Sequence, residues 1–214
     1  MKAMNRLLFR TLSCRTCRLK KPFSPMQRMM FPAVGGAVLG IFLHSRFPAL
    51  AVSPLFTQGL PVCAAQRTLW DVFLTAGLPP LAMLILMPFC STSAFGQAAA
   101  LIILALRGMA LGNALSECFM QYSAGNGFFA ASVLVLPFGF TSVLILANAA
   151  LESVRLANST ARYLFRGISD PDITAKQSHL YIKLLTLTLF ALIAAGVQTL
   201  LCWAMNTWLV SAST

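Results

Sequence analysis

The stretch VFLTAGLPPLAMLILMPFCSTSAFGQAAALIILAL, residues 72–106, lies between Asp71 and Arg107 and contains no charged residue. A membrane-spanning helix needs about 20 largely apolar residues, because it rises about 1.5 Å per residue through a hydrocarbon core of about 30 Å. The stretch is therefore too long for one span and fits two. Pro88 and the polar run Cys90-Ser91-Thr92-Ser93 mark the turn between them, which predicts spans over 69–89 and 94–120.

The rest of the chain repeats this pattern. It has no charged residue between Glu117 and Glu152, where a polar and glycine-rich segment at 123–127 interrupts the apolar sequence, and it has none after Lys183. The sequence therefore predicts an all-α fold, a polytopic membrane helical bundle that forms one transmembrane domain over 29–214. Its five expected spans are 29–46, 69–89, 94–120, 128–154 and 180–210.

The last two helices are expected to be long. No Gly or Pro occurs from 140 to 165, so the fourth span can continue as one helix to Arg166. The turn 167–172 carries helix stop and start signals, and the next helix is expected from near Ile173 to about Val210. Helices of this length must tilt strongly or project past the bilayer.

Composition supports a membrane protein. The chain of 214 residues is 58% hydrophobic and 10% charged, with a mean hydropathy of +0.78. A soluble domain carries about 25% charged residues, so an ordinary soluble enzyme is excluded, and the chain is too apolar for intrinsic disorder. The formal charge is nevertheless +11, from 16 basic and 5 acidic residues.

Half of the basic residues lie in the first 28 positions, where no acidic residue occurs. This composition favours a mitochondrial transit peptide over 1–28, and a basic tail on anionic lipid is the alternative. The positive charge of this segment is therefore better explained by targeting than by nucleic-acid binding. Cys14 and Cys17 form a CxxC in this leader, but zinc needs four ligands and no second pair is near. We expect no metal, cofactor or disulfide framework.

Ionisable and amide side chains inside the spans are the functional candidates, because burying them in a bilayer is costly. They are Arg107, Asn113, Glu117, Asn148 and Glu152, with Gln198 in the last span. Three of them have a structural alternative. Arg107 could satisfy backbone carbonyls or line a wet crevice, Glu152 could pair with Arg155 three residues on, and Gln198 could bond between helices.

Small residues and prolines predict how the helices pack. Gly36 and Gly40 form one GxxxG pattern, and Gly108 and Gly112 form another that Ser116 extends. Pro79, Pro80 and Pro137 are expected to kink or interrupt their spans. Motifs of soluble enzymes are absent from the sequence, including HExxH, GxSxG and a phosphate-binding glycine loop, so we predict no catalytic residues.

The run Leu104-Ala105-Leu106-Arg107, followed by Asn113 and Glu117, resembles subunit a of F-type ATP synthases. That family carries an Arg in an apolar helix, then an Asn, then a His or Glu. Phe138-Gly139-Phe140 and Leu151-Glu152 are similar to its following helix, so the likeness covers about 101–160.

Departures from the family leave a second register open. The Asn comes two positions late, Leu115-Ser116 replaces the usual Ala-Gly, and Asn158-Ser159 stand where a Gln is expected. In the second register Gln198 matches that Gln, and Arg162 takes the place of the essential Arg, with Arg155 seven residues before it. The depth of Arg107 in its span favours the first register.

The resemblance implies a stator subunit that offers two half-channels to a rotating ring of c subunits. Its Arg would attract the ring carboxylate and block a direct proton leak, and Glu117, Asn148 and Glu152 would relay protons. The implied partners are membrane lipid, the c-ring and other stator subunits, and the implied location is the mitochondrial inner membrane or a bacterial-type cell membrane. A transporter subunit with a path along Arg107 and a non-catalytic membrane scaffold remain alternatives.

Overall fold

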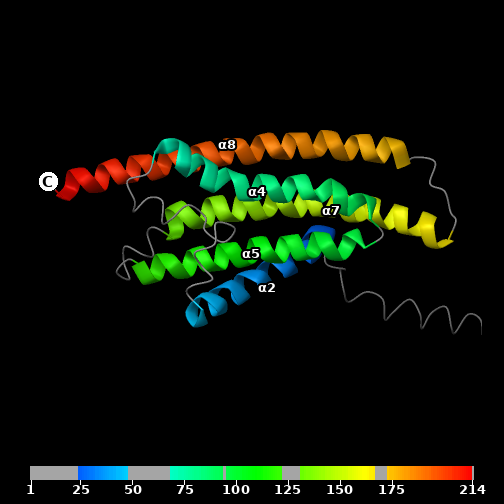
Figure 1. The fold of residues 1–214 in the computed structure, drawn as a ribbon, viewed down its shortest axis with the longest axis horizontal. Coiled ribbons are helices and arrows are strands. Elements are labelled where there is room, and N and C mark those ends of the chain that lie inside the picture. Colours follow the sequence, from blue (N-terminus) through cyan, green and yellow to red (C-terminus); the bar gives the residue numbers. More distant parts are fainter. Residues whose placement is uncertain (1–23, 48–67, 94, 122–130, 167–172, 214) are drawn as a thin grey trace, which may run out of the picture.

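The computed structural model describes residues 24–47, 68–93, 95–121, 131–166 and 173–213 (Figure 1). All regular structure in this part of the chain is helical, which confirms the predicted all-α bundle. In chain order the elements are α2 (Pro25–Arg46), α4 (Leu69–Thr92), α5 (Gly96–Gln121), the short π-helix η3 (Ala131–Val135), α7 (Leu136–Arg166) and α8 (Ile173–Ser213). Most of the predicted leader with Cys14 and Cys17, the break at 123–127 and the turn 167–172 lie outside the described residues.

Five of these helices are long and apolar enough to cross a membrane. Large apolar side chains remain exposed on them, including Phe89 at 69% and Leu185 at 72%. A surface with so many exposed apolar side chains is unfavourable in water and favourable in lipid. In a bilayer every backbone N–H and C=O must be hydrogen-bonded within the protein, and α-helices meet this requirement. The chain is therefore a multi-pass membrane protein.

The first span, α2, begins earlier than the predicted residue 29. The Ser24 hydroxyl accepts a hydrogen bond from the Gln27 N–H at 3.2 Å, and the Ser24 N–H donates to Gln27 Oε1 at 2.8 Å. This reciprocal cap fixes the helix start, and Pro25 follows it at the first helical position. Residues 25–28, which the sequence assigns to the leader, are the first turn of α2.

The closest helix contact joins α2 and α5 through their GxxxG glycines. A Cβ atom added to Gly36 would lie 2.0 Å from the Ala105 carbonyl oxygen, and one on Gly108 would lie 1.9 Å from that of Ala33. Gly40 and Gly112 meet the backbones of Met109 and Ala37 in the same way. Only glycine permits this approach of two backbones.

Most of the polar run after Pro88 belongs to α4, which continues to Thr92 with Ser93 as its C-cap, so the turn begins later than the sequence predicts. The Ser91 hydroxyl donates to the Pro88 carbonyl at 2.6 Å, and the Thr92 hydroxyl donates to that of Phe89 at 3.0 Å. Because these hydroxyls bond back to the preceding turn, they continue the helix to Thr92. The chain then reverses within a few residues, and a Cβ on Gly96 would lie 1.5 Å from the Cys90 carbonyl oxygen.

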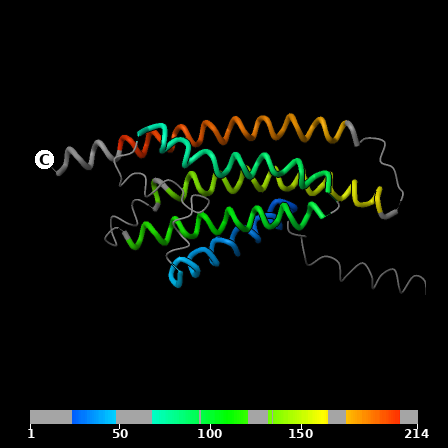
Figure 2. Tube along the Cα trace, viewed as in Figure 1, coloured from blue at the N-terminus to red at the C-terminus, as the bar shows by residue number. Residues whose placement is uncertain are grey.

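Proline has different effects in α4 and α7. α4 continues through Pro79 and Pro80, and its axis bends in the first half of the helix (Figure 2). Pro137 is the second residue of α7, directly after the π-helical segment η3. The irregular backbone therefore lies just before this proline.

α7 and α8 form a long antiparallel hairpin (Figures 1 and 2). α7 runs unbroken to Arg166 and α8 begins at Ile173, so both expectations are confirmed. With 41 residues, α8 is about 60 Å long, twice the hydrocarbon thickness. The main core lies where α4, α5, α7 and α8 meet, around the fully buried Met87, Leu104 and Leu146.

Candidate functional site

Arg107 lies in the middle of α5 and is 4% exposed. Its Nε donates a hydrogen bond of 2.6 Å to the Ser142 hydroxyl on α7. A cavity of about 20 Å³ adjoins both side chains and is also lined by Pro80 of α4 and Gln198 of α8. This volume suits about one water molecule. No acidic side chain is among the ten described residues that line it.

Arg107 and Gln198 are thus brought to the same cavity, although the sequence placed them in different registers. Gln198 is 8% exposed, and the neighbouring Thr199 donates its hydroxyl to the Ala195 carbonyl at 2.8 Å. Arg162 lies elsewhere, near the C-terminal end of α7, and lines a different pocket. Gln198 and Arg162, which share the second register, therefore do not meet.

Glu152 is held between two cations. Its Oε1 lies 3.0 Å from Arg155 on the same helix and 2.6 Å from Lys183 on α8. The pair with Arg155 was expected from sequence, and Lys183 was not. The signal for Lys183 was available, because antiparallel helices of which one ends at Arg166 and the next begins at Ile173 bring these two positions to about the same level.

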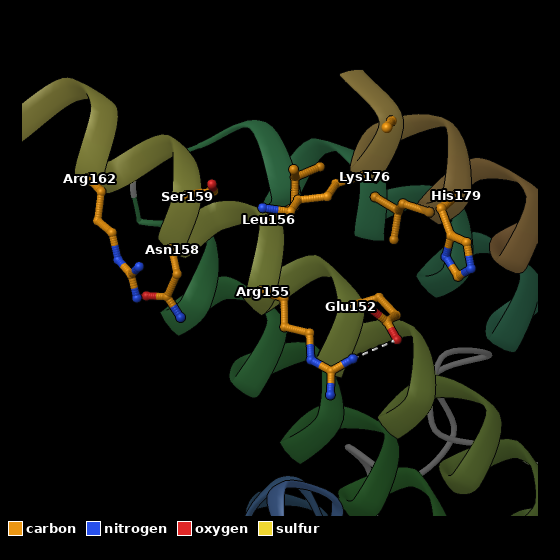
Figure 3. A pocket seen from close by; sticks show the side chains of 10 residues that line it. Glu152, Arg155, Leu156, Asn158, Ser159, Arg162, Lys176 and His179 are labelled. Carbon is orange, nitrogen blue, oxygen red and sulfur yellow. Dashed lines mark hydrogen bonds and ion pairs between the residues drawn. The ribbon is translucent and has the colours of Figure 1, made fainter. Parts of the chain in front are cut away.

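An open pocket of about 570 Å³ lies between α7 and α8 at this end of the hairpin (Figure 3). Its lining is rich in cationic and polar side chains: Glu152, Arg155, Asn158, Ser159, Arg162, Lys176 and His179. The Arg155 side chain is 59% exposed, against 17% for Glu152. The pocket is therefore basic and accessible from outside the bundle.

Asn158 connects this pocket to the rest of the bundle, because the Gln97 side-chain amide on α5 donates to its Oδ1. Asn148, one turn before Glu152, is half-buried and donates to its own helix at the Leu144 carbonyl, 3.0 Å away. Of these three amides, only Asn148 was a candidate from sequence. Gln97 and Asn158 are 61 positions apart in the chain, and no local pattern relates them.

The other predicted polar residues lie near the C-terminal end of α5. Asn113 is 4% exposed, while Ser116 and Glu117 are half-buried. His44, two residues before the end of α2, is 6% exposed. In the described part of the chain, no group of three or more His, Cys, Asp or Glu could hold a metal ion.

No protein-family model, curated protein or solved structure matches the chain. What the site can do therefore follows from its own geometry. One arginine is sealed inside the bundle beside an amide, and a second group of cations faces outward at the end of the hairpin. The first can act only on groups inside the bundle. The second can meet an anion carried by lipid or by another protein.

Proposed function

We propose that the chain is a proton-translocating stator subunit that resembles subunit a of F-type ATP synthases and works against a ring of c subunits in the mitochondrial inner membrane. Five candidate spans that end in a long antiparallel hairpin support this proposal. Such a hairpin offers an extended surface with exposed apolar side chains such as Leu185 and Phe190, along which a rotating ring can slide.

The observation that carries the proposal is the outward-facing positive charge on α7. Arg155 and Arg162 are both exposed, and Arg155 lies inside the candidate span Leu136–Leu164. Glu152 is the only carboxylate among the described residues of this pocket, and Arg155 shares it with Lys183. The surplus positive charge can attract a carboxylate from a partner.

Arg107 is poorly placed to meet a ring. It is enclosed by α4, α5, α7 and α8, and a carboxylate on another subunit could reach it only if the bundle opened. We therefore assign the ring-facing role to the α7 arginines, with Arg155 first because it is deeper in its span. Arg107 then acts as a fixed positive charge that opposes proton passage through the interior.

The size of the interior cavity argues against a solute transporter. A path for a solute lined by Arg107 would need far more room than about 20 Å³. The basic composition of residues 1–28 supports delivery to mitochondria. Most of this segment lies outside the described residues, so delivery to mitochondria remains part of the proposal.

Co-purification tests the proposal. The tagged full-length chain is purified in mild detergent from the mitochondrial membranes in which it is native, and the partners are identified by mass spectrometry. We expect the ring and the nucleotide-binding subunits of an ATP synthase at stoichiometric levels. Recovery of the intact chain in a large complex that lacks every ATP synthase subunit would contradict the proposal.

A further inference from the structure

The basic pocket between α7 and α8 lies at the boundary of two membrane-spanning segments. The candidate spans end at Leu164 on α7 and begin at Ala175 on α8. Arg162 is two residues before the first of these limits, and Lys176 is one residue after the second. The headgroups of a bilayer begin where its hydrocarbon core ends, so both cations lie at the level of the lipid phosphates.

The polar side chains of this pocket come from both helices (Figure 3). Arg155, Asn158 and Arg162 are three and four residues apart, so they lie along one side of α7. Lys176 and His179 line the same pocket from the first two turns of α8. Arg162, Lys176 and His179 are exposed, so a ligand that approaches from outside the bundle can reach them.

The pocket suits an anion that carries several oxygen acceptors. Among its described lining residues, three side chains are cationic and one, Glu152, is acidic. An arginine can give a phosphate two parallel hydrogen bonds, and a lysine adds a compact positive charge. The volume of about 570 Å³ lies within the range of about 300–1,000 Å³ that is usual for ligand sites. A phosphate group with part of a headgroup therefore fits the pocket.

An exposed apolar strip on α8 begins beside this pocket. Ile182 follows His179 by three residues, and Leu189 and Ile193 follow Ile182 by seven and eleven, so these side chains lie along one side of the helix. The exposed fractions of Ile182, Leu189 and Ile193 are 67%, 58% and 55%. From His179 to Ile193 the helix rises about 21 Å into the membrane. A fatty acyl chain can lie along such a strip, whereas a soluble anion has no use for it.

We propose that this pocket binds the headgroup phosphate of an anionic phospholipid through Arg162 and Lys176, and that an acyl chain of the lipid lies along the strip from Ile182 to Ile193. Basic pockets between transmembrane helices are typical binding sites of anionic lipid headgroups. The lipid does not compete with the proposed ring contact. Arg162 is seven residues beyond Arg155, about 10 Å along the axis of α7, so Arg155 remains available to the partner carboxylate.

Lipid binding is measured on the purified full-length chain in mild detergent, so the test needs no other subunit. The chain is stripped of lipid and titrated with phosphatidylglycerol or phosphatidylcholine, and bound lipid is counted by native mass spectrometry. We expect phosphatidylglycerol to bind at least about tenfold more tightly, because no choline cation balances the charge of its phosphate. Equal affinities for the two lipids would overturn the proposal.

Three pairs of substitutions locate the site. Arg162→Gln with Lys176→Gln is expected to weaken phosphatidylglycerol binding by at least about tenfold, because it removes both cations that hold the phosphate. Arg28→Gln with Arg46→Gln is the matched control and is expected to stay within about twofold of wild type, since it removes two exposed charges on α2 that do not line the pocket.

The third pair, Arg162→Lys with Lys176→Arg, keeps both charges and separates a loss of charge from misfolding. It is expected to bind phosphatidylglycerol within about threefold of wild type. Equal losses in the glutamine pair and the α2 control pair would overturn the site. A loss in the charge-conserving pair as large as that in the glutamine pair would also overturn it.

A further measurement separates a lipid from a free anion. Phosphatidylglycerol with a diazirine group in its acyl chain is bound and photolysed, and the adducts are mapped by peptide mass spectrometry. We expect adducts within 182–193, and we expect a large excess of inorganic phosphate to leave most of the lipid bound. Displacement by inorganic phosphate without adducts on α8 would reject the lipid as the ligand. Tight phosphatidylglycerol binding by a chain that purifies from its native membranes without ATP synthase subunits would keep the lipid site and reject the proposed function.

Discussion

The bundle interior around Arg107 and the open end of the α7–α8 hairpin both contain an arginine within hydrogen-bond distance of a polar side chain. Their surroundings are opposite. Arg107 donates to one hydroxyl beside a cavity of about 20 Å³, and Arg155 lies beside Glu152 at the edge of a pocket of about 570 Å³. The first arginine is enclosed by four helices, and the second is 59% exposed.

This difference teaches that the position of an arginine in a span does not define its role. From sequence, depth along the helix favours Arg107, because a charge is most costly at the centre of a bilayer. The structure adds the direction in which the side chain can act. Only an arginine at the surface can form and break an ion pair with a subunit that moves past it. The exposure of the side chain therefore distinguishes an arginine that can interact with another subunit from one that cannot.

The largest expected effect separates the two arginines directly. Arg155→Gln is expected to lower proton-driven ATP synthesis by about 10²-fold in an assembled complex, because it removes the charge that we propose meets the partner carboxylate. Arg155→Lys keeps the charge but loses the planar fork, and it is expected to retain part of the activity. Arg107→Met removes the interior charge that opposes proton passage, and its loss of ATP synthesis is expected to be smaller than that of Arg155→Gln. The reverse order of effects would restore Arg107 as the essential residue.

The next effect concerns the glycine contact that holds α2 on α5. Gly36→Ala places a methyl group against the Ala105 carbonyl, so the free energy of unfolding is expected to fall by about 2 kcal/mol or more. Gly35→Ala is the matched control, because nothing lies within 4 Å of its added Cβ and alanine favours the helix by about 0.5–1 kcal/mol. Thermal unfolding in detergent measures both. Equal shifts would mean that the helices are not in close contact.

Ser142→Ala is expected to cost about 1.5 kcal/mol, because it leaves the buried Arg107 guanidinium without this hydrogen bond. Thr141→Ala on the same helix is the control, since Thr141 is exposed and bonds only back to the Pro137 carbonyl. Its effect is expected within about 0.5 kcal/mol. A larger loss in Thr141→Ala than in Ser142→Ala would show that Arg107 does not depend on Ser142.

The smallest effect is expected at the ion pair between the two hairpin helices. Lys183 and Glu152 are partly exposed, at 37% and 17% of their side chains, so solvent weakens their attraction. A double-mutant cycle of Lys183→Met and Glu152→Gln is expected to give a coupling energy of about 0.5–1 kcal/mol that falls as salt is added. A coupling energy of zero at low salt would show that the ion pair between Lys183 and Glu152 does not stabilise the hairpin.

Much of the fold follows from the sequence, because uncharged stretches bounded by charges define membrane spans. Both long helices of the hairpin were predicted, since α7 has no Gly or Pro over 140–165 and the turn has clear stop and start signals. The turn after Pro88 was misplaced, because serine and threonine hydroxyls can continue a helix as well as end it. The helix start after Ser24 was missed, because Arg28 extended the basic segment and residues 25–28 were therefore assigned to the leader.

The candidate site was only partly predictable. Single polar residues in spans identified Arg107 and Glu152, but Ser142 and Lys183, which contact them, lie on other helices. Ser142 is 35 residues from Arg107, and Lys183 is 31 from Glu152. These pairings depend on how the helices pack, and so does the burial of His44. In a helix that is apolar on all sides, the sequence does not show which neighbouring helix a polar side chain will face.

The central claim is that the outer side of α7 faces a ring of c subunits. Site-specific photo-crosslinking tests it, with a benzoyl-phenylalanine placed at Tyr163 on α7 or, as the control, at Val38 on the outer side of α2. Both side chains are exposed, at 53% and 62%. We predict that position 163 crosslinks to the ring subunit in native membranes and that position 38 does not. A ring crosslink from position 38 alone would contradict it.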